Sequence, residues 1–150
     1  MNFEIRKIKD KDIPQLILLF KEFSHFEKTP EKMTNTVEKM KAEREYLNGF
    51  VALNEDEQII GYATWFYAFF TWVGKSLYMD DLYVKQEYRA KGIGSKLINT
   101  VIDFAKKENC NRIRWQVSSW NKNAIEFYRK LGAGINDVLL NCDLILNKSK

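Results

Sequence analysis

The 150-residue sequence has little of several features that mark particular protein classes. Its two cysteines, Cys110 and Cys142, form no CxxC pair, so the sequence indicates neither a disulfide framework nor a cysteine metal site. The single histidine, His25, has no partner at a metal-ligand spacing, and we expect no bound metal. There are two prolines and seven glycines, with no repeat, linker or low-complexity tract. A single domain over residues 1–150 is therefore expected.

Long hydrophobic runs and blocks of like charge are also missing. The longest apolar segment, YATWFYAFFTWVG, is too short and too aromatic for a membrane span, and the N-terminus lacks the apolar core of a signal peptide. The net charge of +4 arises from 24 basic and 20 acidic residues that are interspersed, and no nucleic-acid-binding motif accompanies it. We therefore expect a cytoplasmic protein that binds neither nucleic acid nor a membrane.

Hydrophobic periodicity predicts the order strand, two helices, three strands, helix, strand, helix, strand. The expected strands cover residues 3–8, 50–53, 59–70, 75–84, 111–119 and 135–147, the last as a strand or strand pair, and the expected helices cover 12–27, 29–47, 94–109 and 121–133. Residues 54–58, NEDEQ, predict a hairpin turn. The strand, loop, helix and strand over 75–119 are typical of a right-handed crossover between parallel strands. The fold class is therefore α/β, with a mixed sheet and helices on its faces.

The stretch EYRAKGIGSKL, residues 87–97, places two glycines at the start of a predicted helix. Glycine lets the backbone approach a phosphate closely, and a helix N-terminus offers N–H donors and a positive dipole end. Ser95 after Gly94 departs from the Walker pattern, and Leu97 occupies the third glycine position of the dinucleotide fingerprint. The loop alone predicts an anion site, while an ordinary glycine-rich turn remains the alternative.

The surrounding residues resemble the GNAT superfamily of N-acetyltransferases. DDLYVKQEYRAKGIGSKLI is similar to its acyl-CoA loop, and SSWNKNAIEFYRKLGA to its second motif. KEFSHFEK and TWVGKSLYMDDLYV further resemble the diamine branch, the spermidine/spermine and thialysine acetyltransferases. The resemblance implies a mostly antiparallel twisted sheet with a parallel pair splayed at the cofactor site. It also implies a homodimer that moves an acetyl group from acetyl-CoA to a primary amine of a small diamine, polyamine or lysine-like molecule, by direct attack in a ternary complex.

The same resemblance assigns roles to individual residues. Tyr128 would donate a proton to the leaving thiolate, and Asp80, where the family usually has Glu, would accept the proton of the amine. The residues implied to face the amine are Phe26, Glu27, Asp80 and Asp81. Those implied to bind the cofactor are Leu82, Tyr83, Val84, Arg89, Ala90, Lys91, Gly92, Ile93, Gly94, Ser95, Asn121, Lys122, Asn123 and Ala124.

Chemistry constrains these roles independently. An alkyl amine has a pKa of about 10 and must lose a proton before it attacks a thioester. Carboxylates can accept that proton directly or through water, and the candidates are Glu27, Asp80 and Asp81. Asp80 and Asp81 are neighbours in a predicted strand, so their side chains point to opposite faces unless a bulge intervenes. Tyr128 lies one helical turn after Ala124, on the same helix face. A peptide acetyltransferase and a non-catalytic acyl-CoA-binding module remain the alternatives for the function.

The aromatic run over residues 65–72 predicts either a substrate channel or a dimer interface.

Overall fold

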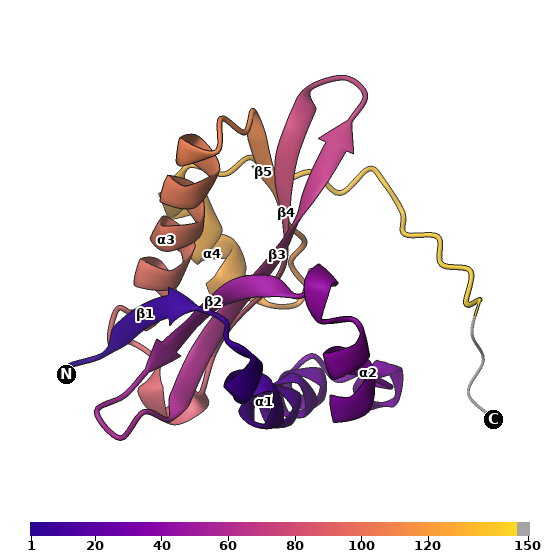
Figure 1. Ribbon diagram of the computed structural model, residues 1–150. Coiled ribbons are helices and arrows are strands. Elements are labelled where there is room, and N and C mark those ends of the chain that lie inside the picture. Colours follow the sequence, from indigo (N-terminus) through magenta and orange to yellow (C-terminus); the bar gives the residue numbers. More distant parts are fainter. Residues whose placement is uncertain (147–150) are drawn as a thin grey trace. The chain divides into compact units, whose positions relative to one another are not determined.

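A mixed sheet forms the centre of the first of two compact units in the computed structural model, which describes residues 1–146 (Figure 1). This unit is Met1–Gln116, and its strands lie in the order β1 to β5. The strands are β1 (Glu4–Lys7), β2 (Asn48–Leu53), β3 (Ile59–Phe70), β4 (Gly74–Val84) and β5 (Arg112–Arg114). Neighbouring strands are antiparallel except β4 and β5, which are parallel and joined through α3 (Ile93–Lys107). The predicted mixed sheet and its parallel pair are confirmed.

Helices cover both faces of this sheet. On one face, α1 (Ile13–Phe26) packs Phe20 against Tyr62 with ring centroids 5.1 Å apart. On the other, α3 packs Phe104 against Trp65 at 4.6 Å. Tyr62 and Trp65 are three residues apart in β3, so their side chains lie on opposite faces. α2 (Val37–Ala42) adds Met40 to the buried cluster on the α1 side.

The predicted helix over residues 29–47 is wrong in its extent. Only α2 is α-helical there, and short 3₁₀ turns cover Pro30–Lys32 and Arg44–Tyr46. The Thr36 hydroxyl accepts a hydrogen bond from the Lys39 N–H at 3.1 Å and so caps a helix that begins at Val37. The residues before Thr36 therefore form a loop beside the C-terminal end of α1.

The predicted C-terminal strand is also wrong over its described residues, 135–146, while residue 147 lies outside them. No strand forms in this segment, and Val138, Leu139 and Leu140 are 78–88% exposed. A strand needs a neighbour to bond its backbone groups, and an apolar alternation cannot provide that neighbour. The strand predicted over 111–119 is shorter than expected as well, since β5 ends at Arg114.

The second unit begins at Val117 and contains α4 (Lys122–Leu131). Asn121 caps this helix, because its side-chain oxygen accepts a hydrogen bond from the Ala124 N–H at 3.2 Å. Gly132 follows the helix with φ of +99°, a left-handed conformation that glycine adopts easily. Asparagine before the first turn and glycine after the last turn are both typical cap residues. Across residues 1–146, no helix is long and apolar enough to cross a bilayer.

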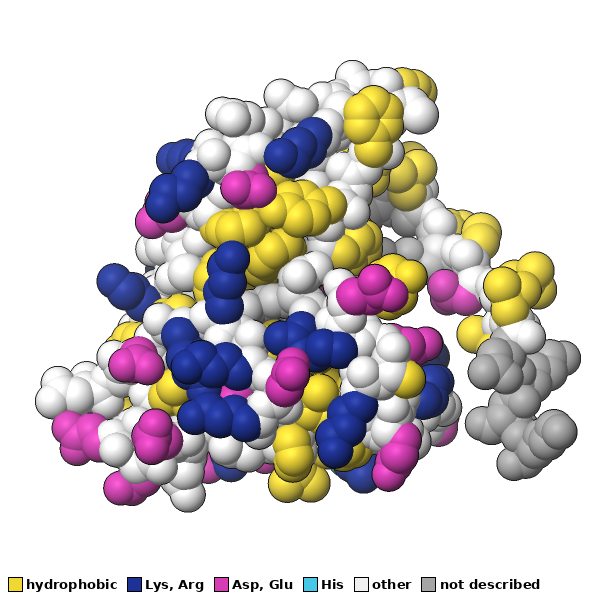
Figure 2. Space-filling view, in the orientation of Figure 1, with side chains coloured by type: hydrophobic (Ala, Val, Ile, Leu, Met, Phe, Trp, Pro, Cys, Tyr) yellow, Lys and Arg dark blue, Asp and Glu magenta, His cyan; other side chains and the backbone are white. Residues whose placement is uncertain are grey.

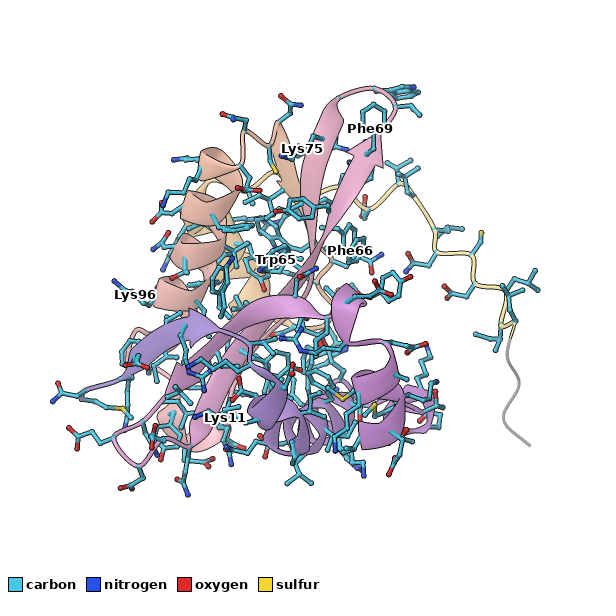
Figure 3. The ribbon with its side chains drawn as sticks, in the orientation of Figure 1. Lys11, Trp65, Phe66, Phe69, Lys75 and Lys96 are labelled. Carbon is cyan, nitrogen blue, oxygen red and sulfur yellow. The ribbon has the colours of Figure 1, made fainter. Side chains whose placement is uncertain are left out.

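The aromatic run leaves the core as β3 continues. Trp65 is 5% exposed, whereas Phe69 is 78% and Trp72 is 95% exposed at the end of the β3–β4 hairpin. Figure 3 shows Phe69 near the tip of this hairpin and the consecutive Trp65 and Phe66 on opposite sides of β3. Hydrophobic side chains are visible on the surface over the same hairpin (Figure 2). The run therefore divides into a core part and an exposed part.

Candidate active site

A pocket of about 420 Å³ opens in the first unit, between α1 with the loop that follows it and strands β2 to β4. This size falls within the range of small-molecule sites. Its lining residues are Phe20, Phe23, Ser24, Glu27, Thr29, Lys32, Met33, Asn35, Tyr46, Leu47, Asn48, Thr64, Trp65, Phe66, Asp80 and Asp81. The pocket thus brings together three of the four residues predicted to face the amine, namely Glu27, Asp80 and Asp81.

A bulge in β4 places Asp80 and Asp81 in the same pocket. Thr64 of β3 is paired with Asp81 and Trp65 with Met79, so Asp80 is an extra residue without a partner in the ladder. Such an insertion interrupts the alternation of side chains, and two successive residues then share one face. The bulge that would allow both carboxylates to share one face of the sheet is therefore present.

The protein surroundings weaken the acidity of both carboxyl groups. Burial, the neighbouring Asp80 and the more distant Glu27 raise the pKa of Asp81 to about 7, although a hydrogen bond from the Tyr62 hydroxyl at 3.1 Å acts in the opposite direction. Partial burial by the pocket walls also raises the pKa of Asp80. Part of this residue is still exposed to solvent. Asp81 can therefore change its protonation state near neutral pH.

Phe26 does not line this pocket. Its ring lies under the guanidinium of Arg89, 4.6 Å from the ring centroid to Cζ, and Arg89 also lies 5.4 Å from the Tyr83 ring. Arg89 Nε donates to the Val84 carbonyl at 2.9 Å, which fixes the guanidinium between the end of α1 and the end of β4. The Tyr83 hydroxyl in turn bonds Glu22 of α1. Arg89 is the first residue of the glycine loop, residues 89–95, and it joins this loop to α1, the helix that Glu27 follows.

The glycine loop has the geometry of an anion cradle. Gly92 precedes α3 with φ of +84°, and a Cβ built there would meet no atom within 4 Å. No side chain caps the N-terminus of this 15-residue helix, so the N–H groups of its first turn remain available to a ligand. Ala90 also has a positive φ, +62°. These residues fit the pyrophosphate group that acetyl-CoA would bring.

The end of β4 has an edge that β5 does not cover. The β4–β5 ladder runs from Ser76 to Tyr78, whereas β4 continues to Val84. The Lys85 N–H bonds Ile60 of β3, so by alternation the backbone groups of Leu82 and Val84 point to the uncovered edge. One of them, the Val84 carbonyl, is already occupied by Arg89. The parallel pair is therefore splayed beside the glycine loop, as predicted.

The remaining predicted residues lie in the second unit. Asn121 is the N-cap of α4, and Lys122, Asn123 and Ala124 form its first turn. Tyr128 follows one turn later, with its ring 5.4 Å from that of Phe127. The roles of these residues in cofactor binding and proton donation stay predictions.

Comparison with known proteins decides the family. The model of the Acetyltransferase (GNAT) family matches residues 13–133. The chain belongs to the GNAT acetyltransferases. A thialysine N-epsilon-acetyltransferase of Bos taurus is 33% identical over 140 residues, covering 86% of this chain and 82% of the relative. The Caenorhabditis elegans enzyme of the same name is 36% identical over 129 residues, covering 85% and 80%.

A solved structure shows the same fold. The crystal structure of an aminoglycoside acetyltransferase from an uncultured soil metagenomic sample, in complex with trehalose, superposes with a TM-score of 0.79. It is 22% identical in sequence, and the match covers 97% of each chain. This likeness shows the predicted fold with its mixed sheet, and the family assignment makes the chain an N-acetyltransferase.

Sequence reasoning missed many of the residues that line this pocket, and Thr64 and Lys32 are the two that bear most on its chemistry. Thr64 is 7% exposed and lines the pocket, yet its hydroxyl has no hydrogen-bond partner in the described part of the chain. Counting back from the hairpin turn would have paired it with the Asp80–Asp81 region. Lys32 also lines the pocket, but it lies in the stretch expected to be helical, and no periodicity marks a loop lysine as a pocket residue.

Proposed function

We propose that this GNAT enzyme transfers an acetyl group from acetyl-CoA to the primary amine of a small diamine, polyamine or lysine-like acceptor. The observation that carries the proposal is the β4 bulge, which aims two carboxylates into one pocket with Glu27. An alkylammonium group is attracted by this negative pocket and must lose its proton there. The names of the two thialysine acetyltransferases support the same class of acceptor.

Acetyl-CoA supplies the activated acetyl group as the second substrate. The free N–H groups at the start of α3, with Ala90 to Ser95, would bind its pyrophosphate, and Lys91 would add positive charge. The uncovered edge at Leu82 would pair with the pantetheine arm through backbone groups, and Arg89 holds this edge against α1. Asn121 to Ala124 would border the cofactor from α4.

The Asp80–Asp81 pair would take the proton from the ammonium. Two carboxylates that share a pocket hold a proton more tightly than either does alone, and a pKa of about 7 at Asp81 leaves the pair ready to accept one near neutral pH. The neutral amine would then attack the thioester carbonyl directly in a ternary complex, and Tyr128 would return a proton to the departing sulfur.

Release of CoA in the presence of an amine panel tests this function. The panel contains putrescine, spermidine, spermine, thialysine, lysine and a short peptide, each with acetyl-CoA at pH 7 to 9. We expect turnover with at least one small amine and little with the peptide. Turnover confined to the peptide would establish a peptide acetyltransferase instead. Acetyl-CoA binding without turnover on any amine would support a non-catalytic binding module.

Substitution of Tyr128 tests the proton donor. Tyr128→Phe keeps the ring and removes the hydroxyl, so kcat should fall by about 100-fold, the range of general acid catalysis, while acetyl-CoA still binds. Phe127→Leu, which changes the neighbouring ring, serves as a control and should lower kcat far less. Equal kcat in Tyr128→Phe and the unmodified enzyme would remove Tyr128 from the chemistry.

A further inference from the structure

Charge is divided unevenly over the walls of the acceptor pocket. The acidic residues that line it are Glu27, Asp80 and Asp81, and Lys32 is the basic residue among the lining side chains. Asp80 and Asp81 belong to β4, whereas Lys32 belongs to the 3₁₀ turn Pro30–Lys32 that follows α1. The pocket therefore offers a negative wall on the sheet and a positive group on a different wall.

The turn that carries Lys32 is held in place. The Lys32 N–H bonds the Thr29 carbonyl at 3.0 Å, and the Met33 N–H bonds the Pro30 carbonyl at 3.1 Å. Met33 is partly buried and packs against the hydrophobic cluster that also contains Tyr62 and Tyr83. The Lys32 residue is exposed, but the hydrogen bonds of its turn and the packing of Met33 position its backbone at the pocket.

The polar lining of the sheet wall is incomplete without a ligand. The Thr64 hydroxyl is buried beside Asp81, its partner in the β3–β4 register, and has no hydrogen-bond partner in residues 1–146. A buried hydroxyl without a partner is costly, and a ligand amine would provide the missing hydrogen bond. The reacting ammonium group is therefore expected at this wall, which leaves Lys32 to meet another part of the acceptor.

A free diamine and a lysine-like amino acid differ at the end of the molecule that is remote from the reacting amine. A diamine or polyamine carries only positive charges, so its second ammonium would be repelled by Lys32. A lysine-like amino acid carries a carboxylate, which Lys32 would attract, and its α-ammonium can approach Glu27. The three acidic lining residues attract both kinds of acceptor, and Lys32 is the charged group that favours the amino acid over the polyamine.

We propose that Lys32 is a specificity-determining residue that binds the α-carboxylate of a lysine-like amino acid and selects it over diamines and polyamines, an inference that rests on the proposed function. Transfer then takes place on the side-chain amine at the Asp80–Asp81 wall, while Lys32 remains outside the bond-forming step.

Two substrate pairs that differ only by the carboxylate test this assignment. They are L-lysine with cadaverine, and L-thialysine with its decarboxylated analogue 2-(2-aminoethylsulfanyl)ethylamine. Values of kcat/KM are measured with acetyl-CoA for the unmodified enzyme, Lys32→Ala and Lys32→Glu. Lys39→Ala, an exposed lysine on α2 that does not line the pocket, is the matched control.

The unmodified enzyme should prefer the amino acid in each pair. Lys32→Ala should reduce that preference by about fivefold, the upper range for one exposed ion pair, and Lys32→Glu should reduce it on the order of twentyfold. Lys39→Ala should leave it unchanged. A preference for the diamine, or a preference for the amino acid that survives Lys32→Glu, would overturn the assignment while leaving the proposed transfer intact.

Failure of the proposed function has a different signature. If no amine is acetylated by any variant, the transfer proposal fails, and calorimetric titration of the unmodified enzyme and Lys32→Glu with lysine and cadaverine then decides the role of Lys32. Tighter binding of lysine that is lost in Lys32→Glu would retain the carboxylate site. Equal binding by both proteins would reject it.

Discussion

At the scale of single residues, Asp81 has two properties that oppose each other. Its burial beside Asp80 raises its pKa to about 7, so the ionised form is disfavoured in the folded protein. The same ionised form is the one that attracts an ammonium and accepts its proton. A group that is costly to the fold when charged and needed in that state for chemistry is typical of an active site.

This opposition predicts a pH-dependent gain of stability in Asp81→Asn. The folded protein holds a proton on Asp81 up to about pH 7, whereas the unfolded chain loses it near 4, so the unmodified protein loses stability as the pH rises between these values. Asn resembles the protonated form and can still bond Tyr62. The variant should therefore exceed the unmodified protein by roughly 1–3 kcal/mol at pH 8 and match it near pH 4.

Thermal unfolding from pH 4 to 8 provides the measurement. Asp103→Asn, which removes an exposed carboxylate on α3, is the control and should track the unmodified protein. A constant difference between Asp81→Asn and the unmodified protein at every pH would contradict the assigned pKa.

The same substitution should also change the pH dependence of catalysis. It removes a like charge beside Asp80, so the rise of kcat/KM with pH should move to lower pH.

At the scale of elements, the C-terminal end of α1, the end of β4 and the glycine loop are joined through Arg89. Its guanidinium packs on Phe26 of α1, its Nε bonds the Val84 carbonyl of β4, and its backbone begins the glycine loop. Sequence similarity suggested a residue that binds the cofactor. The contacts show in addition a connection between the cofactor loop and the helix that lines the acceptor pocket.

We predict that Arg89→Lys raises KM for acetyl-CoA and for the amine together, each by about fivefold to tenfold. Lysine keeps the charge but loses the planar group that stacks on Phe26 and donates to Val84. A double-mutant cycle with Phe26→Leu checks the contact, since stacked partners should show a coupling of about 1 kcal/mol. Additive effects, or a change in KM for acetyl-CoA alone, would argue against the connection.

The elements also show where sequence reasoning succeeds and where it stops. Strong alternation and a polar turn were enough to predict β3, β4 and their neighbours, and helical periodicity was enough to predict α4 within two residues at each end. The same rules overextended α2, since Met33 continues the helical spacing but lies in the loop before Thr36. The bulge at Asp80 depends on the register between two strands, and no local sequence pattern contains that register. The sequence alone therefore indicates only that a bulge is needed if both carboxylates are to share a face. Lys32 and Thr64 also line the pocket because of tertiary structure: Lys32 lies in the turn that follows α1, and Thr64 lies opposite Asp81 in the sheet.

At the scale of the whole molecule, large hydrophobic side chains are exposed on two segments, the β3–β4 hairpin and residues 135–146, and the exposed aromatic ones gather on the hairpin. Phe69 and Trp72 lie largely in solvent, although aromatic side chains of this size are rarely exposed together without a partner. The resemblance to the diamine branch predicted a homodimer, and the hairpin is the surface that the aromatic run makes available for one.

We therefore predict a dimer that depends on this hairpin. Light scattering should give a mass of about 36 kDa for the unmodified protein, twice the 17.8 kDa of one chain, and Phe69→Ser with Trp72→Ser should give the mass of the monomer. Leu18→Ser on α1, which removes another exposed hydrophobic side chain, should keep the dimer. A monomeric unmodified protein, or a dimer that tolerates the double substitution, would rule out this interface.

The bulge in β4 has a consequence for how the active site can change in evolution. Because it consists of one additional residue, no point substitution closes it, but the loss of a single codon does. Deleting Asp80 would leave Met79 opposite Trp65 and the next residue opposite Thr64, which is a regular ladder with every later residue in its present register. One in-frame deletion would thus convert a pocket with two strand carboxylates into a pocket with one, without disturbing the cofactor loop. Lineages of this enzyme can therefore gain or lose the second carboxylate in a single genetic step.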